Sequence, residues 1–382
     1  MKKAILQVAD TGPLESLVVM LRSIGYECFL PNDTIKSELR GLGCDCVLDV
    51  SGLVENWGYS QPIDLPLANK AMMGTADLYV DVKAHRNGPK VWSRWPNLEK
   101  RTLWYRINGG EPEHVIKRDE NGNVTEDHGD ERDPPCPILT PNLWYRDERY
   151  DPRLTDRRCL EFQEMVDPGE AIIDCDDWTI PTPWVDKSFA CYPPFYRFDD
   201  YYTKHGRAHL YDKPICLIHN LQGWGYTKLI ERVRALDVRC HGRSSPDGLI
   251  PHGNVARELY SALAMVHLKS SDAPGYALYE GLAAGCPLVV SRRLIWRNRM
   301  QDLLIPEETC LVFDRETHDG LTDQDVDECE LAIGTSLGRL RDPVLNERIG
   351  MAGRAKLQEL MWSEKKQEDV QSLGQFMERM FR

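Results

Sequence analysis

Apolar and polar residues alternate with two different periods along the first fifty positions. Short apolar runs at 3–8, 27–30 and 46–50 have the length of buried strands. Helical spacing of apolar residues lies between the first two runs, with Gly25 behind it as a stop, and a shorter helix is expected at 34–41. The apolar face of the first helix consists of Leu14, Leu17, Val18, Leu21 and Ile24. This pattern predicts a parallel sheet with right-handed helical crossovers.

The second half of the chain repeats this alternation. The expected strands are 214–218, 238–240, 264–268, 287–291 and 310–313. The expected helices are 226–236, 255–263, 277–284, 323–340 and 344–380. Two such units predict an α/β protein with two Rossmann-like domains, whose ligands lie beyond the carboxyl ends of the strands.

The middle of the chain is less regular. Strand character is found at 77–83, 102–107 and 136–140. The polar stretch 118–135 predicts an exposed loop, and residues 174–200, rich in Trp, Pro, Tyr and Asp, predict an irregular connection. We place the domain boundary near 205–213. The expected domains are residues 1–210 and residues 211–382.

Composition narrows the class of protein. A chain of 382 residues with 42% hydrophobic residues has the size of two ordinary domains. Its formal net charge of −13 argues against strong nonspecific binding to nucleic acid. No apolar run reaches the ~18 residues of a transmembrane segment, and the N-terminal residues have the pattern of a strand rather than a signal peptide. The 12 scattered cysteines include no CxxC pair, so we expect buried thiols in a cytoplasmic protein, without a zinc site.

The most informative segment is 270–291. Asp272 and Glu280 stand eight positions apart, and a Pro-Gly-aromatic-small turn between them opens a helix. Amide groups at a helix start favour an anion such as a diphosphate. A carboxylate one turn into that helix has the position to accept hydrogen bonds from ribose hydroxyls. An ordinary loop–helix–strand unit is the alternative that spacing alone leaves open.

This segment resembles the signature of family-4 glycosyltransferases, which are retaining enzymes of the GT-B fold. The resemblance lies in Asp272, Glu280, the Gly275-Tyr276-Ala277 turn and the run 283–290, and it extends over about 214–375. It implies two Rossmann-like domains facing a central cleft, with the last helix crossing back to the first domain. It also implies a nucleotide sugar, expected to be a UDP sugar such as UDP-glucose, and neither a cofactor nor a metal.

The resemblance assigns roles to several residues. Asp272 is expected to contact the transferred sugar as a catalytic residue, and Glu280 to hold the ribose. The amides of Gly275, Tyr276 and Ala277 are expected to face sugar and phosphate. The backbone from Gly253 to Val255 is expected to flank the base.

The chain departs from the family at the cations that bind the diphosphate. His219 stands where the family has an Arg, and Trp224 where it has a Lys. Lys228, Arg243 and Arg292 are candidate substitutes. A solvated surface cation is the alternative for each of them.

Two further candidates lie in the first half. Gly12, at the first strand–helix turn, is expected to approach the donor, with a simple helix start as the alternative. His85 follows a strand end, where such enzymes place a histidine that bonds the sugar, with a loop role as the alternative. Asp174, Asp176 and Asp177 are interpreted as a surface turn rather than a metal site.

The leading hypothesis is therefore a glycosyltransferase that moves a sugar from a nucleotide-sugar donor to a hydroxyl acceptor with retention. The acceptor is expected to be a glycan or a small molecule. One alternative is a phage-type DNA glycosyltransferase that acts on a hydroxymethylated base, because several aromatic-basic stretches suit an extruded base. Another alternative is a non-catalytic nucleotide-sugar-binding protein, suggested by the missing Arg and Lys.

Overall fold

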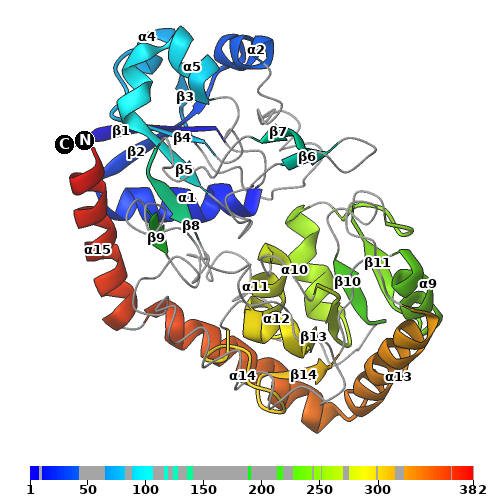
Figure 1. The fold of residues 1–382 in the computed structure, drawn as a ribbon. Coiled ribbons are helices and arrows are strands. Elements are labelled where there is room, and N and C mark those ends of the chain that lie inside the picture. The colour runs from blue at the N-terminus through cyan, green and yellow to red at the C-terminus, as the bar shows by residue number, and fades with distance from the viewer. Residues whose placement is uncertain are drawn as a thin grey trace.

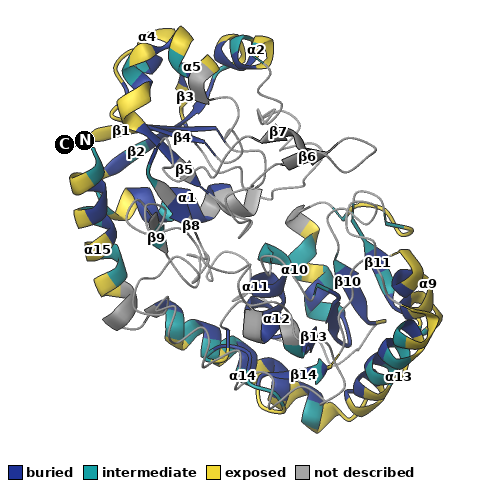
Figure 2. Ribbon diagram, in the orientation of Figure 1, coloured by how far each residue is buried: buried dark blue, intermediate teal, exposed yellow. Residues whose placement is uncertain are grey.

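The computed structural model contains two parallel β-sheets, formed by successive parts of the chain. Helices cover both faces of each sheet (Figure 1). The structure describes residues 1–7, 11–42, 65–81, 88–105, 116–118, 124–127, 136–140, 188–190, 213–217, 227–242, 245–250, 252–269, 275–297, 300–314, 322–362 and 364–381. The strands of both sheets are more buried than the helices that surround them, and the outer faces of these helices are exposed (Figure 2).

Among the described residues, the first sheet has seven strands in the order β3-β2-β1-β4-β5-β8-β9, and these strands pair in parallel. The strands are β1 (Lys2–Gln7), β2 (Tyr26–Pro31), β3 (Leu67–Ala68), β4 (Leu78–Asp81), β5 (Thr102–Tyr105), β8 (Ile138–Thr140) and β9 (Ser188–Ala190). The chain first builds outward from β1 to β3 and then continues on the other side of β1 with β4. The gap between β1 and β4 is therefore the topological switch point of this sheet, where α/β proteins bind ligands.

In the part of the chain that the structure describes, five helices belong to this sheet. They are α1 (Thr11–Ser23), α2 (Asp33–Gly41), α4 (Lys70–Met73), α5 (Gly88–Arg94) and the 3-10 helix η1 (Pro96–Arg101). In α1 the apolar residues at helical spacing are buried against the sheet, as expected from the sequence. Gly25 ends the helical segment with a φ of +88°, a conformation that favours glycine. Asn32 caps α2, its side chain accepting the amide of Ile35 at 3.0 Å.

Within the described ranges, the second sheet has five parallel strands in the order β11-β10-β12-β13-β14. They are β10 (Ile215–Leu217), β11 (Arg239–His241), β12 (Met265–His267), β13 (Leu288–Ser291) and β14 (Cys310–Phe313). The helices are α9 (Thr227–Ala235), α10 (His252–Ser261), α11 (Tyr276–Ala283), α12 (Arg292–Arg297), α13 (Asp323–Arg339), α14 (Pro343–Trp362) and α15 (Glu364–Met380). The switch point of this sheet lies between β10 and β12.

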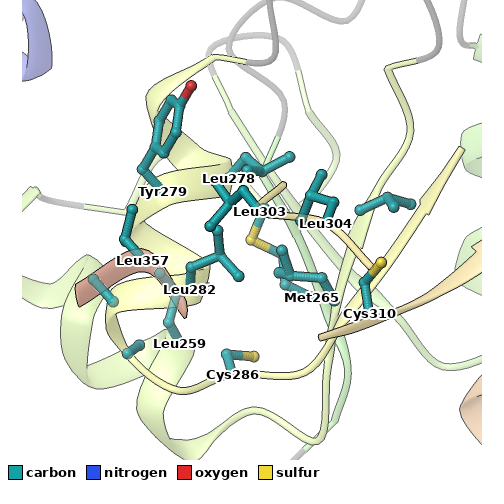
Figure 3. Close-up of a cluster of buried hydrophobic side chains, with 14 of the residues drawn as sticks. Leu259, Met265, Leu278, Tyr279, Leu282, Cys286, Leu303, Leu304, Cys310 and Leu357 are labelled. Carbon is teal, nitrogen blue, oxygen red and sulfur yellow. The ribbon is translucent and has the colours of Figure 1, made fainter. Parts of the chain in front are cut away.

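A continuous apolar core holds α10, α11 and α14 on one face of the second sheet. Figure 3 shows Leu278 and Leu282 of α11 beside Leu259 of α10, Met265 of β12 and Leu357 of α14. The opposite face is covered by α9 and α13. Because α11 is packed on several sides, the start of this helix is held in a fixed place relative to the strands.

The last helix, α15, packs on the first domain. Leu373, Phe376 and Met377 are buried in the same core as the apolar residues of α1 and β1. The ring of Phe376 lies 5.6 Å from that of Phe189 in β9. Since α14 packs on the second sheet and α15 on the first, the C-terminal helices connect the two domains (Figure 1).

The structure corrects several expectations about local structure. Residues 118–135 do not form only a loop, because β6 (Ile116–Arg118) and β7 (Val124–Asp127) pair as an antiparallel hairpin. The stretch 174–200 contains β9, which pairs with β8. Helices α5 and α12 were not expected. The expected strand at 46–50 lies outside the described residues, and so does the expected boundary except for its last residue, Lys213.

The described part of the chain contains no helix with the length and apolar character needed to cross a bilayer. Its cysteines are buried: Cys28, Cys136, Cys216, Cys240, Cys286, Cys310 and Cys329. Burial raises the pKa of the Cys28 thiol to about 11, which keeps it protonated and unreactive at neutral pH.

We predict that Phe376→Ala lowers the free energy of unfolding of the first domain by about 3–5 kcal/mol, because it leaves a cavity under α15. Urea unfolding followed by circular dichroism measures this change. Gln375→Ala is the control, since Gln375 is exposed on the neighbouring position of the same helix. An equal effect of both substitutions would show that α15 does not depend on this contact.

Two glycines should respond to alanine with opposite signs. At Gly353 of α14, an added β-carbon would lie 2.9 Å from Leu282 Cδ2 and 3.1 Å from the carbonyl oxygen of Thr309. Gly353→Ala should therefore destabilise the second domain by about 1–3 kcal/mol. At Gly338 of α13 the space is open, so Gly338→Ala should stabilise by up to ~1 kcal/mol through helix propensity. Urea unfolding measures the free energy of unfolding of both variants. A change in the same direction in both variants would contradict the close approach of α14 to α11.

Candidate functional site

The candidate site lies at the start of α11, at the carboxyl edge of the second sheet. Helix α11 follows β12, one of the two strands that flank the switch point. Gly275 caps the helix with φ +75° and ψ 155°, a backbone conformation that a residue with a side chain rarely adopts. The first amide groups of a helix have no intrahelical acceptor and carry its positive dipole end. Gly275, Tyr276 and Ala277 thus form a turn that suits an anion.

A lysine that was not among the expected site residues, Lys269, lies beside this turn. The ammonium of half-buried Lys269 lies 3.9 Å from the position that a β-carbon on Gly275 would occupy. Lys269 comes two residues after the end of β12, so the strand end directs it to the same edge as the helix start. The signal in the sequence was a lysine directly after an apolar strand run, next to the signature segment. An ammonium and a helix start together provide two sources of positive potential for one anion.

Glu280 is buried in α11, with 8% of its surface exposed. It follows Tyr276 by four positions, so both residues lie on the same face of the helix. The Tyr276 hydroxyl meets a residue of β5 in the first domain. A carboxylate in this position can accept hydrogen bonds from a ligand held between the helix start and the first domain.

The two domains touch at a pair of tyrosine hydroxyls. The hydroxyl oxygens of Tyr105, the last residue of β5, and Tyr276 lie 2.6 Å apart. Burial and the neighbouring Tyr105 raise the pKa of Tyr276 well above its ordinary value, whereas nearby Ser16 acts in the opposite direction. The Tyr276 phenol is therefore protonated at neutral pH, and one of the two hydroxyls donates to the other.

The residues that are expected to flank the base lie on the neighbouring helix. Gly253 is in the first turn of α10, and Val255 is half-buried against the core that α10 shares with α11. Helix α10 follows β11, so its start also lies at the carboxyl edge of the sheet. The structure thus brings the starts of α10 and α11 to the same edge.

In the first domain, two buried polar side chains flank the switch point. Gln7 and Asp81 are the last residues of β1 and β4 and are register partners, with 1% and 2% of their surfaces exposed. The Tyr79 hydroxyl donates to Oε1 of Gln7, and Nε2 of Gln7 has no hydrogen-bond partner among the residues that the structure describes. An amide that donates and a carboxylate that accepts suit hydroxyl groups. Gly12 lies in the first turn of α1, behind the end of β1.

Two of the cations considered as substitutes have protein partners. Lys228, in the first turn of α9, forms an exposed ion pair with Asp323 at 3.1 Å. Arg292, at the start of α12, pairs with Asp314. Asp272, His85, His219 and Arg243 lie outside the described residues.

Comparison with known proteins supports the architecture. No protein-family model matches the sequence, and no curated protein matches it. Among solved structures, sucrose-phosphate synthase from Thermosynechococcus elongatus is similar over 100% of this chain and 99% of its own, with 14% identity and a TM-score of 0.50. A glycosyltransferase from Rickettsia africae ESF-5 has 9% identity, coverage of 100% and 99%, and a TM-score of 0.46. S. aureus TarM, solved with UDP, has 12% identity, coverage of 78% and 55%, and a TM-score of 0.43.

At these identities the likeness concerns the fold. The likeness to sucrose-phosphate synthase, together with the two parallel sheets and their switch points, identifies the architecture as GT-B, two Rossmann-like domains that face a central cleft.

Proposed function

We propose that this protein is a glycosyltransferase that moves a sugar from a nucleoside-diphosphate sugar, with UDP as the nucleotide, to a hydroxyl acceptor. The observation that carries the proposal is the arrangement at α11. The glycine cap and the ammonium of Lys269 lie together at the start of this helix, and the buried Glu280 follows five residues after the cap. The GT-B architecture and the resemblance of 270–291 to the family-4 signature support the same conclusion.

In this proposal, the turn at Gly275 and the ammonium of Lys269 hold the diphosphate. During transfer, the bond between the anomeric carbon and the diphosphate oxygen breaks, and negative charge grows on the leaving group. A fixed cation and a helix start stabilise that charge more strongly in the transition state than in the donor. Lys269 thus takes the place of the cations that the family has at the positions of His219 and Trp224. The proposal requires no metal ion or cofactor.

The remaining donor contacts follow from the same geometry. Glu280 accepts hydrogen bonds from the ribose hydroxyls, and the backbone at Gly253 and Val255 flanks the base. Asp272 contacts the transferred sugar, as the resemblance implies. The acceptor oxygen bonds to the anomeric carbon, its proton leaves with the diphosphate or solvent, and the configuration is retained.

The acceptor is proposed to be a glycan or a small polyhydroxylated molecule that reaches the cleft from the first domain. Gln7 and Asp81 at the switch point of the first sheet suit hydroxyl groups. The protein is acidic, with a formal net charge of −13, which favours such acceptors over a polyanion such as DNA.

Lys269→Met should weaken UDP binding by about tenfold or more, because it removes a charge-assisted contact to the diphosphate. Isothermal titration calorimetry with UDP measures this change. Lys213→Met is the matched control, since Lys213 is exposed and pairs with Asp237 at 2.6 Å. Lys228→Met decides between the two candidate cations: a loss of affinity in this variant, with Lys269→Met unchanged, would move the diphosphate to α9.

Glu280→Gln should abolish most nucleotide release from the preferred nucleotide sugar, because a neutral amide holds the ribose more weakly than a carboxylate. A screen of nucleotide sugars that detects free nucleotide tests this, with polyols, glycans and hydroxymethylated DNA as separate acceptor arms. Stimulation by a polyol or glycan is the expected result. Stimulation by the modified DNA alone would assign the DNA-modifying activity instead. Binding of UDP without release from any donor would identify a non-catalytic binding protein.

A further inference from the structure

The two tyrosines that join the domains occupy special positions in their elements. Tyr105 ends β5 at the carboxyl edge of the first sheet, and 1% of its surface is exposed. Tyr276 is the first residue of α11 and directly follows the Gly275 cap. Their hydroxyl oxygens, 2.6 Å apart, connect the acceptor-side sheet to the turn that we assign to the diphosphate.

We propose that Tyr105 is a positioning residue for donor binding, acting through the hydroxyl of Tyr276. The hydroxyl contact ties the first turn of α11 to the first domain, so that closure of the two domains and the ordering of this turn are one event. The inference rests on the proposed function, because the turn is the place where that function puts the diphosphate.

Rigid packing on both sides makes this contact suitable for transmitting position. The ring of Tyr105 belongs to the first-domain core together with Leu103 and Leu139. On the other side, Tyr276 packs against the second-domain core, and its ring makes an edge contact with Tyr279 at 6.4 Å between centroids. A hydrogen bond between two side chains anchored in this way is lost when the domains separate by a few ångströms.

The consequence for binding follows from linkage. If the closed arrangement holds the α11 turn in its anion-binding geometry, UDP binds this arrangement more tightly than the open one. Removing the hydroxyl contact then lowers the population of the closed arrangement, and the apparent affinity falls by the factor by which this population falls. A single buried hydrogen bond of ordinary strength corresponds to a change of about 2- to 10-fold.

Single and double phenylalanine variants test the proposal, because Tyr→Phe removes only the hydroxyl. Tyr105→Phe and Tyr276→Phe should each weaken UDP binding by about 2- to 10-fold in calorimetry, and the double variant should be no weaker than either single one. In small-angle X-ray scattering without ligand, the single variants should have a larger radius of gyration than the unsubstituted protein. Tyr79→Phe is the matched control: it also deletes a buried hydroxyl of the first sheet, but one that bonds Gln7 within the domain.

Two results would overturn the inference. One is UDP affinity and scattering that are unchanged in both single variants. The other is an equal loss in Tyr79→Phe, which would indicate a general loss of stability. Failure of the proposed function is distinct, because the unsubstituted protein would then not bind UDP, whereas the scattering comparison without ligand would still report whether the hydroxyl contact holds the domains together.

Discussion

The packing of α15 on the first domain is the interaction on which the arrangement of the molecule depends. This helix follows α14 in the chain, and α14 belongs to the core of the second domain. Burial of Leu373, Phe376 and Met377 beneath the first sheet therefore anchors the far end of the C-terminal segment. Two separate cores are joined in this way by apolar burial rather than by a flexible tether alone. A site assembled from both domains needs such a connection.

The proposed diphosphate site also needs a local positive potential, although the protein as a whole is acidic. The formal net charge of −13 is spread over the whole chain, but a bound diphosphate responds mainly to charges within about a Debye length, ~8 Å at physiological ionic strength. At the start of α11, the helix dipole and the ammonium of Lys269 act together over such a short range. Overall acidity and a diphosphate site are thus compatible, and the acidity disfavours large polyanions elsewhere on the surface.

The close packing of α11 explains how that potential is kept in place. Gly353 lets α14 approach Leu282, and Gly281 lies where an added β-carbon would be 2.8 Å from Leu288 Cδ2. A helix with so little space around it cannot shift without losing contacts on several sides. Tyr276 adds a contact to the first domain at the one end of α11 that points out of the core. The start of α11 is therefore held in place by packing in the second domain, and it also contacts the first domain.

Much of this protein was determined by local sequence patterns. The spacing of apolar residues was sufficient to predict α1, β2, β12 and α11. Burial on one face of an element imposes this spacing, whichever element packs against it. The glycine cap of α11 was likewise readable, since only glycine suits its positive φ. The tertiary structure alone decided the hairpin β6–β7 and strand β9, which have three or four residues each and are stabilised by strands they pair with rather than by their own pattern. It alone also placed Lys269 at the cap and Tyr105 against Tyr276, because a sequence records which residues prefer burial or a turn, but not which distant segments meet when two domains pack together.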